Sequence, residues 1–439
     1  MATTDAKSHQ LIGSELNLFN FNEISPGSCF FLPKGAIVYN KLKYYMLKLW
    51  KKKGYEEVIT PNIFSNSLFK KSGHWGKYRE NIFTLNQGDN EQQVQSQYLS
   101  EPDKDPNSLI SSEPGGCCSG NQNNNKINYS LKPMNCPGHC IMFKHLNPSY
   151  RDLPIRLGDF GALHRNELKG ALRGLTRVRK FSQDDAHIFC REDQINEEVS
   201  NVLKFIKEVY DIFNFETEAR FSTRPEKYIG SEELWDKAED ILEKQIVEHF
   251  GVKDGKWKLE EGDGAFYGPK ISVYIKDSLN RMHQCATVQL DFNLPERFKL
   301  KYKNDKGEFN RPVIIHRAIY GSIERFMAIL LEHTCGKLPY FVSPRNICIV
   351  PIHLDHLYYC DKVRDELLDR MPDSDIFVDR SDRREKNKIR EAYKLCFNYI
   401  LVIGKREIDN KTVNVNKNGL GEISLDKLID HIQLNKHKF

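Results

Sequence analysis

Two neighbouring segments carry charged and polar side chains at positions where a buried sheet would normally have apolar ones. They are residues 161–167 and residues 177–187. Side chains alternate between the two faces of a strand, so Arg165 and Glu167 share a face of the first segment. One face of the second holds an aromatic ring, an amide, a carboxylate and an imidazole, namely Phe181, Gln183, Asp185 and His187. We interpret this surface as a ligand-binding face, because buried polar groups need partners; the alternative is an exposed hairpin whose charges face water.

A second arginine-bearing segment, residues 316–326, favours the ligand-binding interpretation. Gly321 and Ser322 precede apolar residues at helical spacing, which predicts a helix that begins after Ser322 and carries Arg325 in its first turn. A guanidinium can pair with two phosphate oxygens at once. Two arginines on separate predicted elements therefore indicate a phosphorylated ligand.

Composition sets the broad class of the protein. A length of 439 residues is enough for two or three domains with separate cores. The 65 basic residues barely exceed the 60 acidic ones, so any RNA contact has to come from local patches. Eleven cysteines at irregular spacings, with no signal peptide before them, favour a reducing compartment over a disulfide framework. No apolar run approaches the length of a membrane span, and we expect a cytoplasmic protein with no membrane partner.

Periodicity divides the chain into regions. Apolar spacing predicts a helix over residues 38–49, followed by a strand over residues 55–59. Residues 86–130 are rich in Gln, Asn, Ser and Asp, which is typical of a low-complexity surface insertion. After residue 344, strands alternate with helices, which predicts a smaller α/β domain with a largely parallel sheet. Its predicted elements are residues 347–352, 357–370, 375–378, 386–394 and 399–404.

Several matching words give the chain a family resemblance. The two polar segments resemble motif 2 of the class II aminoacyl-tRNA synthetases, and residues 321–325 resemble motif 3. The helix and strand over residues 38–59 resemble motif 1, the dimer element of those enzymes. Four further words resemble the threonyl-tRNA synthetase family in particular: KPMNCPGH at 132–139, RPE at 224–226, GAFYGPK at 264–270 and TVQLDF at 287–292. The similarity runs from about residue 12 to the C-terminus and is interrupted between residues 86 and 130.

The resemblance implies an α+β fold in two domains. Residues 1–343 would form a class II catalytic domain, an antiparallel sheet flanked by helices, and residues 344–439 a small α/β anticodon-binding domain. It also implies a homodimer that activates L-threonine with ATP and Mg²⁺ to threonyl-adenylate and transfers it to tRNA(Thr).

Roles for the nucleotide-binding residues follow from the same resemblance. Arg165 would bridge the substrate carboxylate and the α-phosphate of ATP, while Arg177 and Arg325 would hold the γ-phosphate. Glu167 would accept from the adenine amino group and Phe181 would stack on the ring. The other expected nucleotide or phosphate contacts are Lys270, Gln284, Thr287 and Gln289.

A histidine completes the set of catalytic candidates. His74 matches a family histidine proposed as the base that helps transfer threonine to tRNA, although a histidine beside a tryptophan can equally be a packed core residue. The catalytic candidates are therefore Arg165, Arg325, His74 and Lys270.

Zinc is a further expectation. Six side chains near the motifs could ligate it: Cys136, His139, Cys140, His187, Cys190 and His316. None forms the close paired spacing of a structural zinc site, so spacing alone does not select a set. The resemblance selects Cys136, His187 and His316 and leaves the other three as packing residues. Three protein ligands would leave open positions for a substrate.

Open metal positions would explain a choice of threonine, whose amine and hydroxyl could both reach the zinc. By the family pattern, Asp185 would receive the hydroxyl, and Tyr267 and Gln183 would flank the amine. A site built for a hydroxyl rejects an analogue without one by ~10⁴–10⁵, which excludes valine. Serine lacks only a methyl group, which a pocket penalises by only ~10–200-fold, so we expect serine to be activated as well.

Departures from the family pattern carry expectations of their own. The resemblance begins almost at residue 1, so the amino-terminal domains, including the one that edits seryl-tRNA, are expected to be absent. We favour a fragment with the synthetic and anticodon-binding units over correction elsewhere. In the last domain Glu407 matches an anticodon-contact position, whereas Cys396 and Asn416 stand where bacterial members place arginine. Two other functions stay open: a prolyl- or seryl-specific sibling, and a catalytically inactive, synthetase-like RNA-binding protein.

Overall fold

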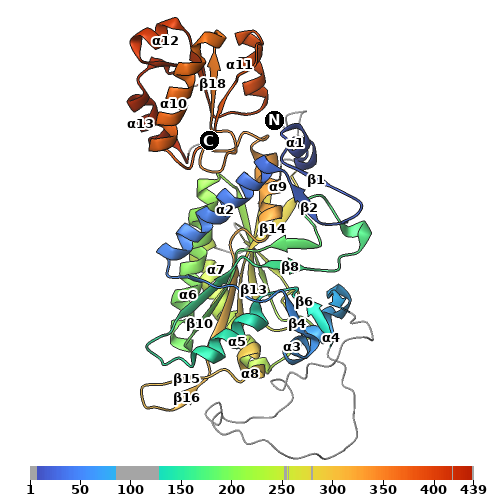
Figure 1. The fold of residues 1–439 in the computed structure, drawn as a ribbon. Coiled ribbons are helices and arrows are strands. Elements are labelled where there is room, and N and C mark those ends of the chain that lie inside the picture. Colours follow the sequence, from blue (N-terminus) through green and yellow to red (C-terminus); the bar gives the residue numbers. More distant parts are fainter. Residues whose placement is uncertain are drawn as a thin grey trace, which may run out of the picture.

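The computed structural model describes residues 7–85, 128–251, 255, 257–277, 280–417 and 419–437. A larger part is built on an eight-stranded sheet, and a smaller part, drawn in orange and red, stands at one end of it (Figure 1). Most of the predicted insertion at 86–130 lies outside the described residues. Its last two residues belong to strand β6 (Tyr129–Leu131), which pairs with β4 and β5 and is therefore part of the fold.

The large sheet has the strand order β12-β11-β13-β14-β17-β10-β7-β3. Its inner strands pair antiparallel, while β12 and β3 join the two edges in parallel. The antiparallel sheet expected from the family resemblance is confirmed, with these edge strands as the difference. The strands are β3 (Glu56–Glu57), β7 (Ile155–Asp159), β10 (Asp185–Cys190), β11 (Thr217–Ser222), β12 (Trp257–Glu260), β13 (Lys270–Lys276), β14 (Met282–Asp291) and β17 (Val313–Ala318).

The register of the central strands decides which side chains share a face. His187 on β10 pairs with His316 on β17, and His316 pairs with Gln289 on β14. Gln289 in turn pairs with Lys270 on β13. Directly paired residues point to the same side of a sheet, so these four side chains from four strands lie across one face.

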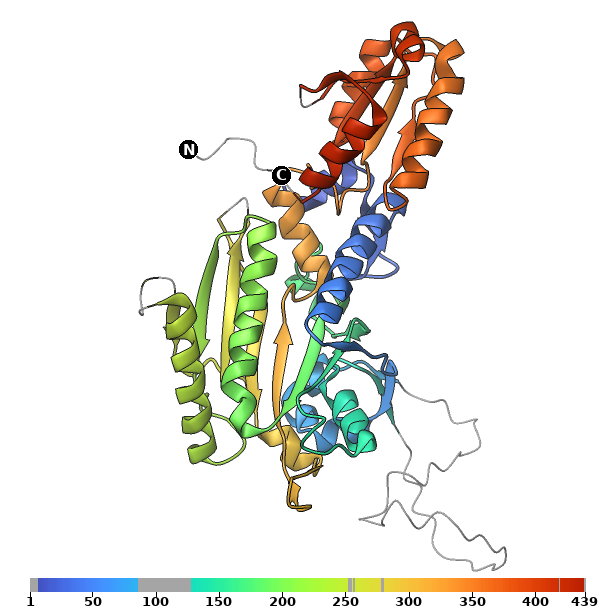
Figure 2. The same ribbon diagram turned by 90° about the vertical axis from the view of Figure 1, so that its left-hand side faces the viewer.

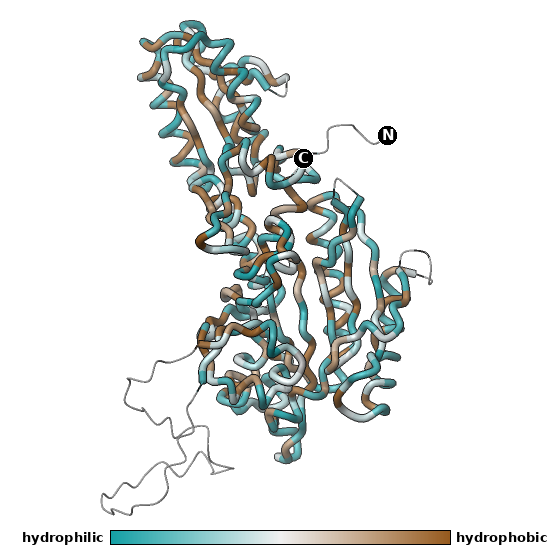
Figure 3. Tube along the Cα trace, turned by 90° about the vertical axis from the view of Figure 1, so that its right-hand side faces the viewer, coloured by the Kyte–Doolittle hydropathy of each residue, from teal (hydrophilic) through white to brown (hydrophobic). Residues whose placement is uncertain are grey.

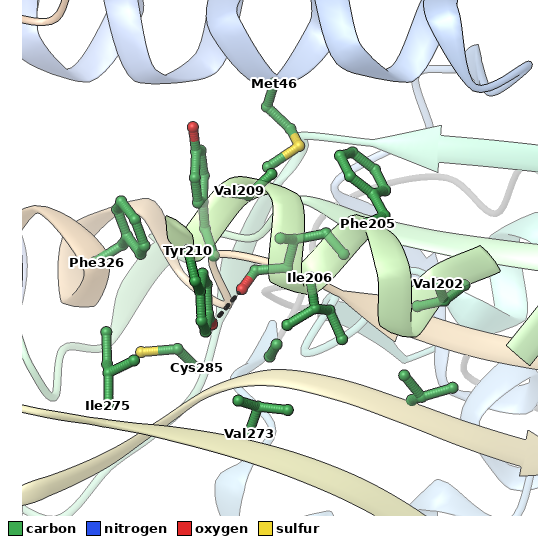
Figure 4. Close-up of a cluster of buried hydrophobic side chains, with 14 of the residues drawn as sticks. Met46, Val202, Phe205, Ile206, Val209, Tyr210, Val273, Ile275, Cys285 and Phe326 are labelled. Carbon is green, nitrogen blue, oxygen red and sulfur yellow. Dashed lines mark hydrogen bonds between the residues drawn. The ribbon is translucent and has the colours of Figure 1, made fainter. Parts of the chain in front are cut away.

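Long helices cover the opposite face. Helices α6 (Ile195–Ile212) and α7 (Glu232–Phe250) lie side by side on it (Figure 2). Apolar residues of α6, among them Phe205 and Ile206, lie between Met46 of α2 (Pro33–Lys52) and Val273 of the sheet (Figure 4). Full burial of each such side chain contributes about 1.5–3 kcal/mol. The helices therefore fix the sheet from one side and leave its polar face for a ligand.

The helix and strand expected between residues 38 and 59 are only partly as predicted. Helix α2 is present and longer, while β3 covers only two of the five expected strand residues. The helix expected after Ser322 is α9 (Ile323–His333), and the Ser322 hydroxyl caps it by accepting from the Arg325 backbone N–H at 3.2 Å.

The polar segments of the sequence form shorter strands than predicted. Strand β8 (Ala162–His164) pairs with β9 (Lys180–Ser182), so Arg165 and Glu167 follow a strand instead of lying on it. The second segment is interrupted at residues 183–184 and resumes as β10. The interruption arises because the Asp184 carboxylate turns into the protein to bind backbone groups near α9.

Shorter elements complete the larger part. They are α1 (His9–Glu15), β1 (Phe19–Phe21), β2 (Cys29–Phe31), β4 (Ile63–Ser65), α3 (Asn66–Lys71), α4 (His74–Tyr78), β5 (Thr84–Leu85), α5 (Cys136–Leu146), α8 (Asn293–Arg297), β15 (Tyr302–Lys303) and β16 (Phe309–Asn310).

The smaller part is an α/β unit with the strand order β19-β18-β20-β21-β22. Strands β18 (Ile347–Pro351), β19 (Ile376–Val378) and β20 (Tyr399–Ile403) are parallel, as predicted, while β21 (Val413–Val415) and β22 (Gly421–Ile423) add an antiparallel edge. Its helices are α10 (Leu357–Arg370), α11 (Glu385–Lys394), α12 (Lys405–Asn410) and α13 (Leu425–Asn435). Apolar and hydrophilic residues alternate along these helices (Figure 3), as expected when one side packs on a core and the other faces water.

Helix α2 connects the two parts. The Lys41 ammonium donates to the Asp375 carboxylate at 2.7 Å, to the Asn346 side-chain oxygen at 3.0 Å and to the Ser343 carbonyl at 2.8 Å. Within the described ranges, every helix is too short or too polar to span a bilayer.

Candidate active site

The polar face of the large sheet forms the floor of a cavity of about 450 Å³. Most of the residues proposed from the sequence line it, although they come from distant parts of the chain. These residues are Cys136, Arg165, Glu167, Arg177, Phe181, Gln183, Asp185, His187, Tyr267, Lys270, Gln284, Thr287, Gln289, His316 and Arg325. Two candidates lie elsewhere: His74 is next to the cavity, and Glu407 is in the smaller part of the chain.

One end of the cavity gathers possible metal ligands. The thiol of Cys136 and one ring nitrogen each of His187 and His316 lie within 4.8 Å of one another, and all three residues are buried. The planes of the two imidazoles meet at 80°, with ring centroids 4.6 Å apart. Cys136 is the first residue of α5, where the helix N-terminus favours a negative charge on the thiol. One thiol and two imidazoles in this spacing form a donor set that suits zinc.

Each of these histidines is held by a second residue. The Nε2 atom of His316 lies 2.9 Å from the Asp291 carboxylate, and Nδ1 of His187 lies 2.7 Å from Nδ1 of His139. Sequence reasoning did not identify Asp291. It assigned His139 to packing alone, whereas His139 also contacts the candidate ligand His187. Partners of this kind orient metal-binding imidazoles in proteins.

Burial sets the charge of this end of the cavity. Burial, reinforced by the nearby Asp185 carboxylate, raises the pKa of the Cys136 thiol well above its usual range. Burial also lowers the pKa of His187 well below its usual range and that of His139 to about 4. The His187 imidazole is therefore neutral, as a metal ligand must be, and the Cys136 thiolate needs a cation beside it to be stable.

His74 lies behind the metal ligands. Its Nε2 atom is 4.0 Å from the Cys136 sulfur, and its Nδ1 atom is 2.7 Å from the Ser72 hydroxyl. The side chain is fully buried, and burial lowers its pKa to about 3. His74 is thus a neutral imidazole beside the candidate metal site, and its role as a base stays a prediction.

The residues expected to contact threonine surround the same end. Asp185 is the first residue of β10, and its carboxylate accepts from the Asn135 side-chain amide at 3.1 Å. Burial raises the pKa of this carboxyl above its ordinary value. The ring centroids of Tyr267 and His316 are 5.2 Å apart. Gln183 pairs with Ser322 in an isolated antiparallel β-bridge.

Arginines line the same cavity. The Arg165 guanidinium lies 5.0 Å from the centre of the Phe181 ring and donates to the Pro133 carbonyl at 3.3 Å. Glu167 accepts from Arg177 at 2.8 and 3.0 Å. The positive charge of Arg165 therefore lies beside the Phe181 ring, on which a nucleotide base could stack.

Arg325 enters from the first turn of α9. Its guanidinium donates to the Thr176 carbonyl at 3.0 Å and to the Gln284 carbonyl at 2.8 Å, which fixes it at the cavity wall. The Gln284 amide donates to the Thr287 hydroxyl at 3.1 Å. Lys270 pairs with Asp263 at 3.0 Å, so a phosphate there would share its charge with that carboxylate.

Asp184 joins the two arginine-bearing segments, a role that sequence reasoning did not identify. Its carboxylate accepts from the backbone N–H groups of Ile319, Tyr320 and Gly321 at 2.8, 2.9 and 3.1 Å. The Arg317 guanidinium also lies 3.3 Å away and is fully buried. Burial raises the pKa of Asp184 to about 7, whereas Arg317 and the backbone donors favour the charged form. Asp184 therefore fixes Arg325 relative to Gln183 and Asp185.

Comparison with known proteins agrees with this geometry. Residues 118–334 match the family model described as the tRNA synthetase class II core domain (G, H, P, S and T), and residues 346–435 match an anticodon binding domain. The cytoplasmic threonine–tRNA ligase of Saccharomyces cerevisiae is 45% identical over 94% of this chain, and threonine–tRNA ligase 1 of Homo sapiens is 46% identical over 97%. The chain spans 51% and 54% of their lengths, respectively.

A solved structure decides the family. The RNA-binding domain of threonyl-tRNA synthetase from Cryptosporidium parvum superposes with a TM-score of 0.85 at 44% identity and covers 99% of both chains. This chain belongs to the threonyl-tRNA synthetase family, within class II. A structure described as a putative threonyl-tRNA synthetase from Aeropyrum pernix matches with a TM-score of 0.73 at 26% identity.

The anticodon candidate has a structural role in this threonyl-tRNA synthetase family member. Glu407 is buried, and its carboxylate accepts from the Gly404 backbone N–H at 2.8 Å, which caps helix α12. The side chain lies in the unit that matches the anticodon-binding model. Contact with an anticodon stays a prediction for this residue.

Proposed function

We propose that this chain is a threonine–tRNA ligase, which activates L-threonine with ATP to threonyl-adenylate and transfers it to tRNA(Thr). The observation that carries the proposal is the meeting of Cys136, His187 and His316 in a cavity that Arg165 and Arg325 also line. A site for a hydroxy amino acid and a site for a nucleotide therefore share one space.

The donor set supports zinc as the bound metal. Cys136, His187 and His316 are buried and close enough to share one ion, and both imidazoles have second partners. When bound, zinc would supply a Lewis-acidic centre with open positions for the amine and hydroxyl of threonine. Valine has no hydroxyl to offer, and a site built for one rejects such an analogue by ~10⁴–10⁵.

Protein groups around the ligands support the orientation of the amino acid. Asp185 is held by Asn135 and would accept from the threonine hydroxyl. Tyr267 and Gln183, which line the same cavity, would flank the amine. The carboxylate of the substrate would then lie toward Arg165.

Activation brings the carboxylate of the amino acid to the α-phosphate of ATP, so two anions must approach each other. Arg165 would contact both and stabilise the negative charge that develops between them. Arg177 and Arg325 would hold the γ-phosphate, and Mg²⁺ would neutralise the phosphates. The protein would supply positioning and positive charge and no nucleophile.

The remaining nucleotide contacts extend from this centre. Phe181 would stack on the adenine and Glu167 would accept from its amino group. The other candidates are the cavity residues Lys270, Gln284, Thr287 and Gln289. Lys270 would have to release or share Asp263 to reach a phosphate.

Transfer to tRNA involves the second part of the chain. The unit over residues 344–439 would contact the anticodon, with Glu407 as a candidate, while His74 would act near the terminal ribose. The side chain of His74 is neutral beside Cys136, so a ring nitrogen is free of a proton, but burial lowers its pKa to about 3 and a base works best with a pKa near the operating pH.

Two further properties are part of the proposal. Exposed apolar side chains near α2, with Tyr44 61% and Ile59 84% exposed, support a homodimer formed through this region. The relatives in yeast and human are named cytoplasmic, which supports the same location for this chain.

Metal analysis combined with threonine-dependent exchange of pyrophosphate into ATP tests the proposal. We expect stoichiometric zinc and exchange with threonine, and loss of both in Cys136→Ala. Cys140→Ala is the matched control, because this cysteine is buried on the same helix and has no assigned ligand role. Exchange with proline or serine but not threonine would assign a sibling function, and RNA binding without any exchange would indicate the inactive alternative.

A further inference from the structure

His139 is a buried residue for which the proposed function has no use. It lies on α5, one turn after Cys136, and its Nδ1 atom is 2.7 Å from Nδ1 of His187. His316 is supported differently, because its Nε2 atom faces the Asp291 carboxylate at 2.9 Å. Each contact occupies one ring nitrogen, so His187 has only Nε2 left for a metal and His316 only Nδ1.

The direction of the contact between His139 and His187 follows from the metal. A neutral His187 that offers the Nε2 lone pair must carry its proton on Nδ1. The Nδ1–H group of His187 therefore donates, and Nδ1 of His139 accepts. His139 in turn must carry its proton on Nε2.

The protonated side of His139 points toward a buried ion pair. Its Nε2 atom lies 4.0 Å from the Asp159 carboxylate and has no hydrogen-bond partner among the described residues. Asp159 is 3.3 Å from the Lys132 ammonium, and it accepts from the Thr60 hydroxyl at 2.7 Å and from the Gly161 backbone N–H at 2.5 Å.

Asp159 and Lys132 form a buried, charge-paired environment for His139. Lys132 and His139 are fully buried, and Asp159 is 1% exposed. Lys132 compensates the charge of Asp159, so the group brings no net charge to the metal site, whereas Asp291 brings a negative one. Removing a lysine and an aspartate from water costs free energy, which is offset only when the two charges are well paired and form further hydrogen bonds.

We propose, on the basis of the proposed function, that His139 is a positioning residue that fixes the proton of His187 on Nδ1 and so presents Nε2 to zinc. The Asp159 carboxylate, 4.0 Å from Nε2 of His139, favours electrostatically the tautomer whose proton is on Nε2 and whose Nδ1 accepts, and Lys132 holds Asp159 in place. Second partners of metal-binding histidines typically account for 10–100-fold in metal affinity, which sets the size of the effect to about that range.

Zinc affinity of the metal-free chain, measured by competition with a chromophoric chelator, tests this inference without using activity. His139→Leu removes the acceptor at similar volume, and we expect zinc binding to weaken by about 10–100-fold. His139→Asn carries an amide oxygen near the place of Nδ1 and should keep the affinity within about 3-fold. His145→Leu, an exposed position on the same helix, is the matched control.

A cobalt spectrum and a replacement variant distinguish a positioning role of His139 from a packing role. Cobalt substitution should give a visible spectrum that changes in His139→Leu and is restored in His139→Asn, which a packing role would not produce. Should His139→Leu fail to fold, His139→Gln replaces it, because its longer amide reaches the place of Nε2 and not that of Nδ1.

Unchanged affinity in His139→Leu, or equal losses in the Leu and Asn variants, would overturn the inference while the proposed function stands. A parent chain that binds no zinc at all would overturn both.

Discussion

Glu324 couples the stability of this fold to pH through a single buried carboxyl group. It lies in the first turn of α9 and is 1% exposed; one oxygen accepts from the Ser182 backbone N–H at 3.1 Å. The other oxygen has no hydrogen-bond partner in the described part of the chain. Burial raises the pKa of Glu324 from 4.5 to about 7. Between these values the folded protein holds a proton that the unfolded chain has released, so stability falls as pH rises.

The predicted loss is on the order of 3 kcal/mol in the free energy of unfolding between about pH 5 and about pH 8. Glu324→Gln should remove this part of the pH dependence, because the amide does not titrate. Urea unfolding of parent and variant at both pH values measures it. Parallel pH profiles for the two proteins would show that Glu324 is ionised in the fold.

Residue type explains which site residues the sequence could predict. Cys136, His187 and His316 can ligate a metal by their own chemistry, and a family pattern can select them. Asp291 and His139 escaped because each acts through a contact with another side chain. Such a contact depends on strand register and helix position, which a single sequence does not contain.

Strand length was overestimated for a related reason. Alternation over residues 181–187 predicted one strand, but the Asp184 carboxylate binds three backbone N–H groups, which ends β9 and starts β10. In contrast, α9 begins where it was predicted, directly after Ser322, and the bounds of α10 and α11 lie close to the predicted ones.

At the scale of elements, Asp184 should contribute to stability more than any cavity residue that contacts only a ligand. Asp184→Asn keeps the shape but places an amide N–H opposite backbone donors and removes the negative charge beside Arg317. We expect a loss on the order of 3 kcal/mol in the free energy of unfolding, because buried donors lose their acceptor. Chemical denaturation measures it, with Asp193→Asn as control, since that side chain is 68% exposed.

Pyrophosphate exchange should fall as well in Asp184→Asn, because the carboxylate fixes α9 and Arg325 relative to β10. A variant that unfolds within about 0.5 kcal/mol of the parent, the usual range for surface changes, would contradict this role.

For the whole molecule, the cavity lies in the larger part and is separate from the smaller α/β unit, and helix α2 connects the two parts. Helix α2 packs on the core of the larger part and binds the smaller part through Lys41. A change deep in the cavity should therefore leave the smaller unit intact. This separation allows catalysis and tRNA binding to be tested independently.

Arg165→Ala tests whether catalysis can be lost while tRNA binding is kept. Arg165 is held over Phe181 within the cavity and supplies positive charge where negative charge develops, so its loss should slow threonine-dependent pyrophosphate exchange by at least about 10²–10³-fold. Binding of tRNA(Thr), followed by fluorescence anisotropy, should stay within a few-fold of the parent, because the smaller unit is untouched. Arg220→Ala is the control, since that arginine pairs with Glu218 and Glu260 away from the cavity. Equal loss of exchange and tRNA binding in Arg165→Ala would mean that the arginine supports the fold and not the chemistry.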